Sequence, residues 1–180
     1  MAAFLQDRNA AGLTCPWFPQ KCFRSCVIAY RDVVAAIART RTIAADPQAV
    51  WDTLADFGSI SGWADNIDHS CILNRRDEPL GTTRRVQIGR NALLETITEF
   101  DALRALAYDV DGLPRRVRRF TNRWSLRSSG NGTVVVLTST VHIGSGPMQT
   151  LAEHAVCHFQ ARQSDIMLAG LAQRWENSGD

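Results

Sequence analysis

The chain has 180 residues, of which 45% are hydrophobic and 21% are charged, and these values are typical of one soluble globular domain. A domain of about 150 residues buries roughly 68–70% of the surface of its unfolded chain, so a core is possible without disulfides or metals. The formal net charge of +2 is too small to indicate a nucleic-acid partner. The sequence contains no run of about 18 apolar residues, the length that would predict a membrane span.

The cysteines and histidines form no recognisable disulfide or metal pattern. Five cysteines are present, an odd number at irregular spacing, which favours a reducing compartment. Cys15, Cys22 and Cys26 have no fourth ligand close by, and His154 and His158, one helical turn apart, have no third. The N-terminal segment also lacks the pattern of a signal peptide. We therefore expect a cytoplasmic protein with neither a metal nor a cofactor.

The N-terminal segment, residues 1–36, has no clear hydrophobic period, because prolines and cysteines are scattered through it. Near its end, Cys26–Ala38 could form a short helix. We predict an N-terminal extension over residues 1–36, either poorly ordered or upstream of the folded unit. A single domain over residues 37–177 is expected to follow it.

The ordered pattern begins with a predicted strand over Ala38–Ala44, whose residues alternate in polarity. Asp46 followed by Pro47 is typical of a helix start, with Asp as the N-cap and Pro in the first helical position. The apolar residues after it recur at helical spacing as far as Gly58, which predicts a short amphipathic helix. A second short helical turn is expected over Ile60–Ala64.

The middle of the chain predicts a run of antiparallel strands separated by turn signals. Gly112-Leu113-Pro114 interrupts the run. Asn131-Gly132 indicates a hairpin turn, because both residues tolerate the positive φ angles that such a turn needs. The predicted strands cover residues 67–74, 82–88, 92–101, 103–111, 117–127 and 133–143.

The Gly89-Arg90 turn predicts the register of one hairpin. If this is a two-residue turn with Gly first, Ile88 lies opposite Asn91. Counting outward along both strands places Arg84 opposite Glu95 on an apolar face, where buried charges need a partner and further hydrogen bonds. The pair could orient a ligand or supply a catalytic acid tuned by the arginine. Alternatively, it could brace the hairpin as a structural ion pair.

The last segment changes to helical periodicity after Gly144–Pro147. It predicts one helix over about 147–176, roughly 45 Å long at 1.5 Å per residue. An apolar face of this helix is expected to lie across the sheet. The residues that a helical wheel of about 100° per residue places on that face are Met148, Leu151, Ala155, Phe159, Ile166 and Ala169.

This order of elements, together with several short motifs, resembles a known superfamily. The motifs are Ala45–Trp51 at the helix entry, Gly81–Arg84, Gly112-Leu113-Pro114, Gly132–Val135 in the last strand and Gly170-Leu171 near the end of the helix. They resemble the START-like (SRPBCC) superfamily, specifically its polyketide cyclase/dehydratase and lipid-transport type, over about 38–176. The resemblance implies an α+β helix-grip fold. In this fold a curved antiparallel sheet of about six or seven strands wraps a long C-terminal helix, and two short helices follow the first strand.

The resemblance also implies a cavity between the sheet and the helix that holds a small hydrophobic molecule. Strand alternation then gives the side chains that face the cavity. Arg162 falls on the predicted apolar face of the helix, where its head could reach water at the cavity rim or cap a polar group of a ligand. The candidate ligand-binding residues are Trp63, Arg84, Glu95, Tyr108, Phe120, Trp124, Leu137, Ser139, Phe159 and Arg162.

Three functions remain open from the sequence. The first is the binding or transport of a small hydrophobic molecule, such as a lipid or a polyketide. The second is a polyketide cyclase/dehydratase-type enzyme, with Arg84, Glu95 and Tyr108 as the acid–base candidates. The third is a protein-interaction or toxin-like regulatory role with a vestigial cavity. A small hydrophobic ligand is the one partner that the sequence predicts, and nothing in the sequence indicates the oligomeric state.

Overall fold

The computed structural model describes residues 33–74, 76–114, 117–143 and 149–176, and for residues 33, 34, 143 and 149–157 it describes the backbone alone. The expectation for residues 1–32 therefore lies outside the described residues. The elements, in chain order, are β1 (Val33–Ile43), α1 (Pro47–Ala55), the 3-10 helix η1 (Phe57–Gly62), β2 (His69–Asn74), β3 (Thr83–Ile88), β4 (Asn91–Asp101), β5 (Ala105–Asp111), β6 (Val117–Ser129), β7 (Gly132–Ile143) and α2 (Gln149–Glu176).

The first strand is longer than the sequence predicts. β1 begins at Val33 rather than at Ala38, because it pairs with β7 along its whole length, from Val33 opposite Ile143 to Ile43 opposite Thr133. Residues 33–38 are strand, so the short helix considered over Cys26–Ala38 is wrong for that part. The expected boundary between residues 36 and 37 falls inside this strand.

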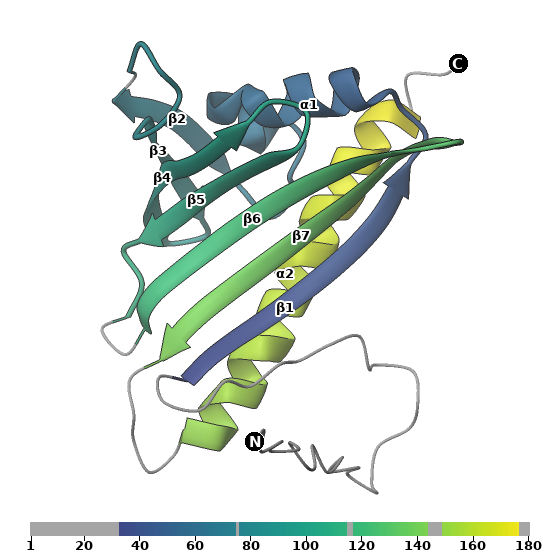
Figure 1. Ribbon diagram of the computed structural model, residues 1–180. Helices are drawn as coiled ribbons and strands as arrows, with labels where there is room; N and C mark the ends of the chain where they lie inside the picture. The colour runs from purple at the N-terminus through teal and green to yellow at the C-terminus, as the bar shows by residue number, and fades with distance from the viewer. Residues whose placement is uncertain (1–32, 75, 115–116, 144–148, 177–180) are drawn as a thin grey trace, which may run out of the picture.

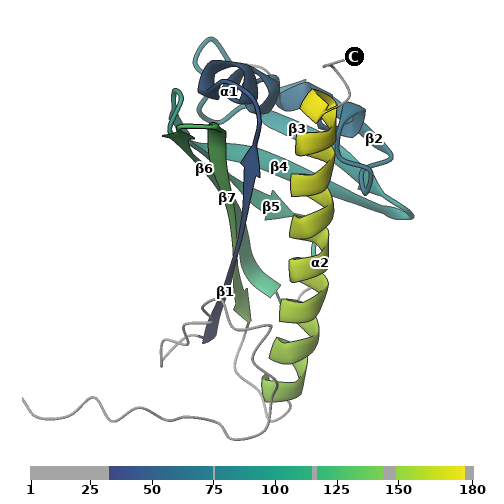
Figure 2. The same ribbon diagram turned by 90° about the vertical axis from the view of Figure 1, so that its right-hand side faces the viewer.

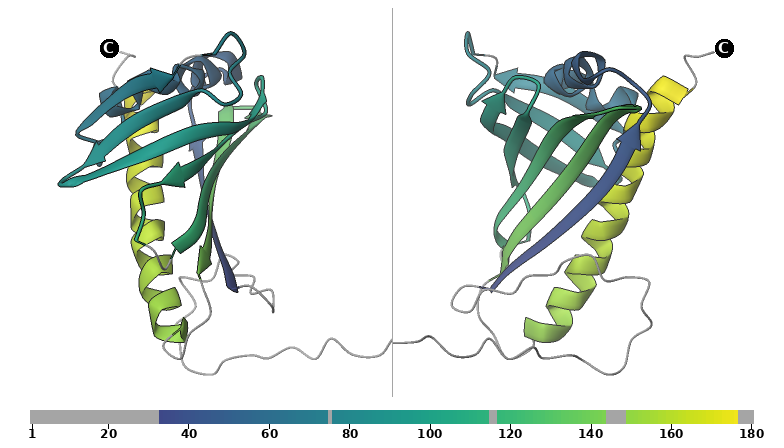
Figure 3. Two further views of the ribbon diagram at one scale, coloured as in Figure 1. Left: turned by 90° about the vertical axis from the view of Figure 1, so that its left-hand side faces the viewer. Right: turned by 45° about the vertical axis from the view of Figure 1, so that its right-hand side comes forward.

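The described strands form one seven-stranded antiparallel sheet in the order β1-β7-β6-β5-β4-β3-β2. The sheet curves strongly, so that β2–β5 cross over one end of the long strands β6, β7 and β1 (Figures 1 and 3). α2 runs along the concave side of this sheet, and α1 and η1 lie at the end where α2 finishes (Figures 1 and 2). This arrangement is the helix-grip fold that the resemblance implies.

The first helix starts as predicted. The Asp46 side chain accepts a hydrogen bond from the Gln48 backbone N–H at 2.8 Å, and Pro47 occupies the first helical position. α1 buries one apolar side, including Val50, Trp51 and Leu54. The second short helix, η1, covers Phe57–Gly62 and so begins three residues before the turn predicted over residues 60–64.

The hairpin registers follow the turn chemistry. Ile88 lies opposite Asn91 and Arg84 lies opposite Glu95, as the Gly89-Arg90 turn predicts. Gly89 has φ +57°, a backbone conformation that glycine adopts without steric cost. The prediction of the β3–β4 register is therefore confirmed.

The predicted inward face of the long helix is wrong in its described part. Phe159 is 58% exposed, and Arg162 is also exposed. The side chains that α2 buries against the sheet lie about half a turn round the helix from them, and they are Ala161, Ser164, Met167, Leu168, Leu171 and Ala172. Met148 lies outside the described residues, and the side chains of Leu151 and Ala155 are not described.

The reason for this face is close packing of the helix backbone. A methyl group added at Gly170 would collide with the backbone carbonyl oxygen of Trp63, so α2 approaches the end of η1 too closely for any larger residue. A residue without a side chain is therefore required at this contact, and the inward face of α2 is set by it as well as by the apolar residues beside it. Within the described segments, neither α-helix is long and apolar enough to cross a membrane.

Candidate functional site

A pocket lies between the concave face of the sheet and α2. Its volume is about 80 Å³, enough for about two or three water molecules at about 30 Å³ each. Its apolar wall comes from the sheet, the loops and α2. The polar side chains that line it are Asn66, Glu95, Asn122, Ser139, Gln160, Gln163 and Ser164, and the apolar ones are Ile67, Ile88, Leu93, Val110, Leu113, Phe120, Phe159 and Met167.

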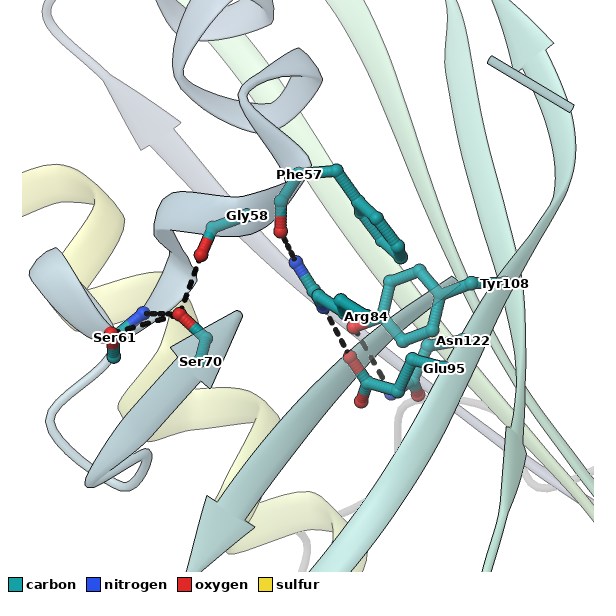
Figure 4. A network of polar contacts seen from close by, with 8 residues as sticks. All are labelled: Phe57, Gly58, Ser61, Ser70, Arg84, Glu95, Tyr108 and Asn122. Atoms are coloured by element: carbon teal, nitrogen blue, oxygen red, sulfur yellow. Dashed lines mark hydrogen bonds and ion pairs between the residues drawn. The ribbon is translucent and has the colours of Figure 1, made fainter. Parts of the chain in front are cut away.

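A buried ion pair lies at one side of the pocket. Arg84 Nε donates to Glu95 Oε2 at 2.6 Å, and the two side chains are only 3% and 7% exposed. Arg84 Nη1 also donates to the Phe57 backbone carbonyl at 2.5 Å, which connects β3 to η1 (Figure 4). Because the charges are buried, the pair needs these additional partners to offset the loss of water.

The guanidinium of Arg84 is enclosed by aromatic rings. Its central carbon lies 3.8 Å from the centroid of the Phe57 ring and 5.0 Å from that of Tyr108. Cation–π attraction adds to the ion pair at such distances. Arg84 is not among the residues that line the pocket, whereas Glu95 is. The arginine therefore lies behind the glutamate and holds it in place.

Tyr108 is fully buried beside this pair and does not line the pocket either. Burial raises the pKa of Tyr108 to about 12, and the negative charge of Glu95 adds to the rise. The phenol therefore stays protonated at neutral pH, and a Tyr108 phenolate base is not available there. Tyr108 contributes its ring to the enclosure of Arg84 and its hydroxyl to a hydrogen-bond chain.

That chain crosses the sheet to the helix. Asn122 Nδ2 donates to the Tyr108 hydroxyl at 3.4 Å, and Ser139 Oγ donates to Asn122 Oδ1 at 2.6 Å. Ser139 Oγ also lies 3.3 Å from Ser164 Oγ on α2. β5, β6, β7 and α2 are thus joined by one run of buried polar groups, and three of its four members line the pocket.

A second link joins α2 to the loop before β2. Asn66 Nδ2 donates to Gln163 Oε1 at 2.6 Å, and both residues line the pocket. Asn66 Oδ1 is buried without a hydrogen-bond partner. Such an atom in a native protein calls for a water molecule or a ligand to satisfy it.

Four of the ten predicted ligand-binding residues line the pocket, namely Glu95, Phe120, Ser139 and Phe159. Five others are buried but elsewhere: Arg84 and Tyr108 lie behind Glu95, and Trp63, Trp124 and Leu137 pack in the core. Trp63 meets Trp124 edge to face, with ring centroids 5.9 Å apart. Arg162 is exposed on the outer side of α2, so the placement that made it a candidate is wrong.

Several lining residues are absent from the predicted set. Ile88, Leu93, Val110 and Asn122 are each an even number of residues from a candidate on the same strand, namely Arg84, Glu95, Tyr108 and Phe120, so strand alternation indicates them. Ser164 and Met167 lie on the helix face that the prediction placed outward. The spacing of small and apolar residues at 161, 164, 168 and 171 is the signal that indicates this face.

A second hollow lies between α1 and the C-terminal end of α2. Its volume is about 310 Å³, and it is more open to the surface than the inner pocket. Trp63 and Trp175 line it together with exposed charged residues of the two helices. It does not include the ion pair or the hydrogen-bond chain, so the buried polar groups of the fold converge on the smaller pocket.

The geometry defines a helix-grip protein with a partly apolar internal pocket, and the sequence matches a corresponding family. Residues 34–176 match the family of polyketide cyclase/dehydrase and lipid transport proteins, and the chain belongs to this family. No curated protein matches the chain.

Solved structures share the fold at low sequence identity. The Zhui aromatase/cyclase from Streptomyces sp. R1128 is similar with a TM-score of 0.67 and 19% identity, over 79% of this chain and 94% of that one. A START superfamily protein from Mycobacterium smegmatis has a TM-score of 0.64 and 15% identity, over 79% and 97%. The di-domain ARO/CYC StfQ from the steffimycin biosynthetic pathway has a TM-score of 0.66 and 11% identity, over 81% and 51%.

Proposed function

We propose that this protein binds a small, largely hydrophobic molecule in the pocket between the sheet and α2. The observation that carries the proposal is the pocket itself, with apolar walls and one charge-compensated carboxylate, that of Glu95. Small-molecule sites combine such walls with a few placed polar groups. Membership of a family of polyketide cyclases and lipid transport proteins supports the same reading.

The pocket must widen to take such a molecule. Its volume of about 80 Å³ is below the range of about 300–1,000 Å³ that is usual for ligand sites. Phe159 lines the pocket and is also 58% exposed, so it lies at the mouth of the pocket, where its movement would not disturb the packed core. We expect the ligand to enter there. Phe159→Ala should speed association, and an unchanged association rate would contradict entry at this point.

Neighbouring leucines on β4 provide a matched test of where the ligand binds. Leu93 lines the pocket, whereas Leu94 points to the other face of the sheet and is 39% exposed. Leu93→Trp should fill the pocket and abolish binding of an apolar fluorescent probe. Leu94→Trp should leave binding intact. Equal binding by the two variants would contradict the proposed site.

The bound molecule can be sought directly. Native mass spectrometry of the purified protein, followed by solvent extraction, should detect a co-purified small molecule in the wild type and in Leu94→Trp. The same measurement on Leu93→Trp should give the mass of the unliganded chain. A ligand retained by Leu93→Trp would place the binding site elsewhere.

Glu95 favours a second candidate function, catalysis of the cyclase or dehydratase type. Glu95 is the one of the three acid–base candidates that lines the pocket, where a carboxylate can accept a proton from a bound ligand. If it acts so, Glu95→Gln should abolish turnover of a poly-β-ketone while ligand binding persists. If the wild type binds the poly-β-ketone without turnover, catalysis is contradicted and only a carrier function remains.

A further inference from the structure

The inner pocket holds two side-chain acceptors that are left without a donor, one of them on a carboxylate. Glu95 is the one charged side chain among the described residues that line it. Glu95 Oε2 accepts the hydrogen bond from Arg84 Nε, and among the described residues Oε1 has no partner. One carboxylate oxygen is therefore open to a donor on a ligand.

The hydroxyl donors of the inner wall are already used. Ser139 has one hydroxyl hydrogen, and it goes to Asn122 Oδ1 at 2.6 Å. In its 3.3 Å contact with Ser164, Ser139 must therefore accept, which uses the Ser164 hydrogen as well. Asn122 Nδ2 is directed to the Tyr108 hydroxyl. The two serine hydroxyls therefore have no hydrogen left for a ligand, whereas Asn122 keeps a second N–H.

The loop side of the pocket holds the second unused acceptor. Asn66 uses its Nδ2 on Gln163 and keeps a buried Oδ1 without a partner. Asn66 also keeps a second N–H, and Gln160 and Gln163, half-buried on α2, add further amide donors. The acceptors left over, Glu95 Oε1 and Asn66 Oδ1, still require a hydrogen-bond donor.

Charge narrows the choice further. Arg84 already neutralises Glu95, and its guanidinium is held between Phe57 and Tyr108, with a hydrogen bond to the Phe57 carbonyl. It cannot turn toward a ligand without losing these contacts. A ligand carboxylate in the pocket would meet Glu95 with no described cation among the lining residues to compensate it.

We propose that the pocket selects an uncharged molecule whose buried end is a hydroxyl donor, an alcohol, phenol or enol, and that it rejects carboxylate-headed lipids. This inference rests on the proposed binding function. It adds the chemical class of the ligand and assigns Glu95 Oε1 and Asn66 Oδ1 as the acceptors that recognise it.

Three probes with one ring system test the selection. At neutral pH 2-naphthol is uncharged and can donate, 2-methoxynaphthalene is uncharged and cannot donate, and 2-naphthoate is an anion. Isothermal titration of the wild type should give the naphthol at least about tenfold tighter binding than either of the others, as for a hydrogen bond to a charged acceptor. Naphthoate binding as tight as naphthol binding would overturn this inference and leave the proposed function standing. Binding of none of the three would contradict both.

Glu95→Gln should reverse the preference. The amide offers a donor in place of an acceptor and leaves Arg84 as an uncompensated cation, so naphthoate should bind more tightly and naphthol more weakly than to the wild type. Glu99→Gln, on the same strand but with its side chain 38% exposed and outside the pocket, is the matched control and should behave as the wild type. If Glu95→Gln does not fold, the wild-type comparison of the three probes decides the question alone.

Discussion

Replacement of Arg84 by methionine tests the role of the buried ion pair. The substitution keeps an unbranched apolar stem but removes the guanidinium. Glu95, whose side chain is 7% exposed, then becomes a buried carboxylate without its counter-charge. The hydrogen bond from Nη1 to the Phe57 carbonyl and the contact with the Phe57 ring are lost at the same time.

The size of the effect follows from burial. Two unit charges about 4 Å apart attract by about 4 kcal/mol at an effective dielectric constant of about 20. Removal of one partner of a buried pair commonly costs about 3–5 kcal/mol, because the other charge stays desolvated. We therefore expect Arg84→Met to lower the free energy of unfolding by about 3–5 kcal/mol.

Urea unfolding at neutral pH measures this cost, and a second ion pair on the sheet provides the control. Arg123 Nε also lies 2.6 Å from a carboxylate oxygen, that of Glu99, but these side chains are 47% and 38% exposed. Arg123→Met should cost less than about 1 kcal/mol. Equal costs for the two methionine variants would refute the reasoning from burial. The double variant Arg84→Met/Glu95→Leu should be more stable than Arg84→Met alone, since no charge is then left buried.

Three further changes have expected outcomes. Burial raises the pKa of Tyr108 to about 12 in the folded protein, so the contribution of its protonated phenol to the free energy of unfolding is complete below about pH 10 and is lost as the pH rises toward 12. In urea unfolding, Tyr108→Phe should remove about 2–3 kcal/mol of this alkaline loss. A hydrogen bond from Arg123 lowers the pKa of Glu99, so the small contribution of its carboxylate to the free energy of unfolding is present above about pH 4 and is lost as the pH falls. The free energy of unfolding of Glu99→Gln should therefore fall less steeply with decreasing pH than that of the wild type. Gly170→Ala should lower the free energy of unfolding by about 1–3 kcal/mol, because the added methyl group collides with the Trp63 carbonyl, although alanine has the better helix propensity. An unchanged melting temperature would contradict that collision.

The sheet could be predicted well because its signals are local. A two-residue turn at Gly89-Arg90 and a side-chain period of two together determine the β3–β4 register, and with it the pairing of Arg84 with Glu95. Alternation likewise identifies the inward sides of β5, β6 and β7. The start of β1 could not be predicted in the same way, because it depends on the length of its pairing with the distant strand β7.

The prediction of the helix face failed because α2 carries apolar residues on both sides, so hydrophobicity alone does not choose between them. Ser164 and Gly170 are buried, whereas Phe159 is exposed and Ile166 is only half-buried. At Gly170 the neighbour is the backbone of Trp63, and only a residue without a side chain fits. A helical wheel that ranks positions by apolar content does not detect such a close backbone approach. Arg162 became a candidate ligand residue through that same error.

The core aromatics show a different limit. Trp124 and Leu137 face inward as predicted but do not reach the pocket. Strand alternation gives the face on which a side chain lies but not what lies opposite it. Whether the side chain meets another core residue or the pocket depends on its position along the strand and on which residues of α2 and η1 lie opposite that position. Trp124, for example, meets Trp63 of the loop after η1.

The close approach of α2 to the chain at Trp63 also explains the position of the pocket. The C-terminal half of α2 packs tightly, with Gly170 against the chain at Trp63 and with Leu168 and Leu171 fully in the core. Further toward its N-terminus the helix presents the short side chain of Ser164, whose hydroxyl lies 3.3 Å from that of Ser139 on the sheet. Close approach at one end fixes the spacing of helix and sheet, and a short side chain at that spacing leaves a space. Polar groups of the sheet therefore meet an opening instead of a packed residue at this level, and the carboxylate of Glu95 faces it.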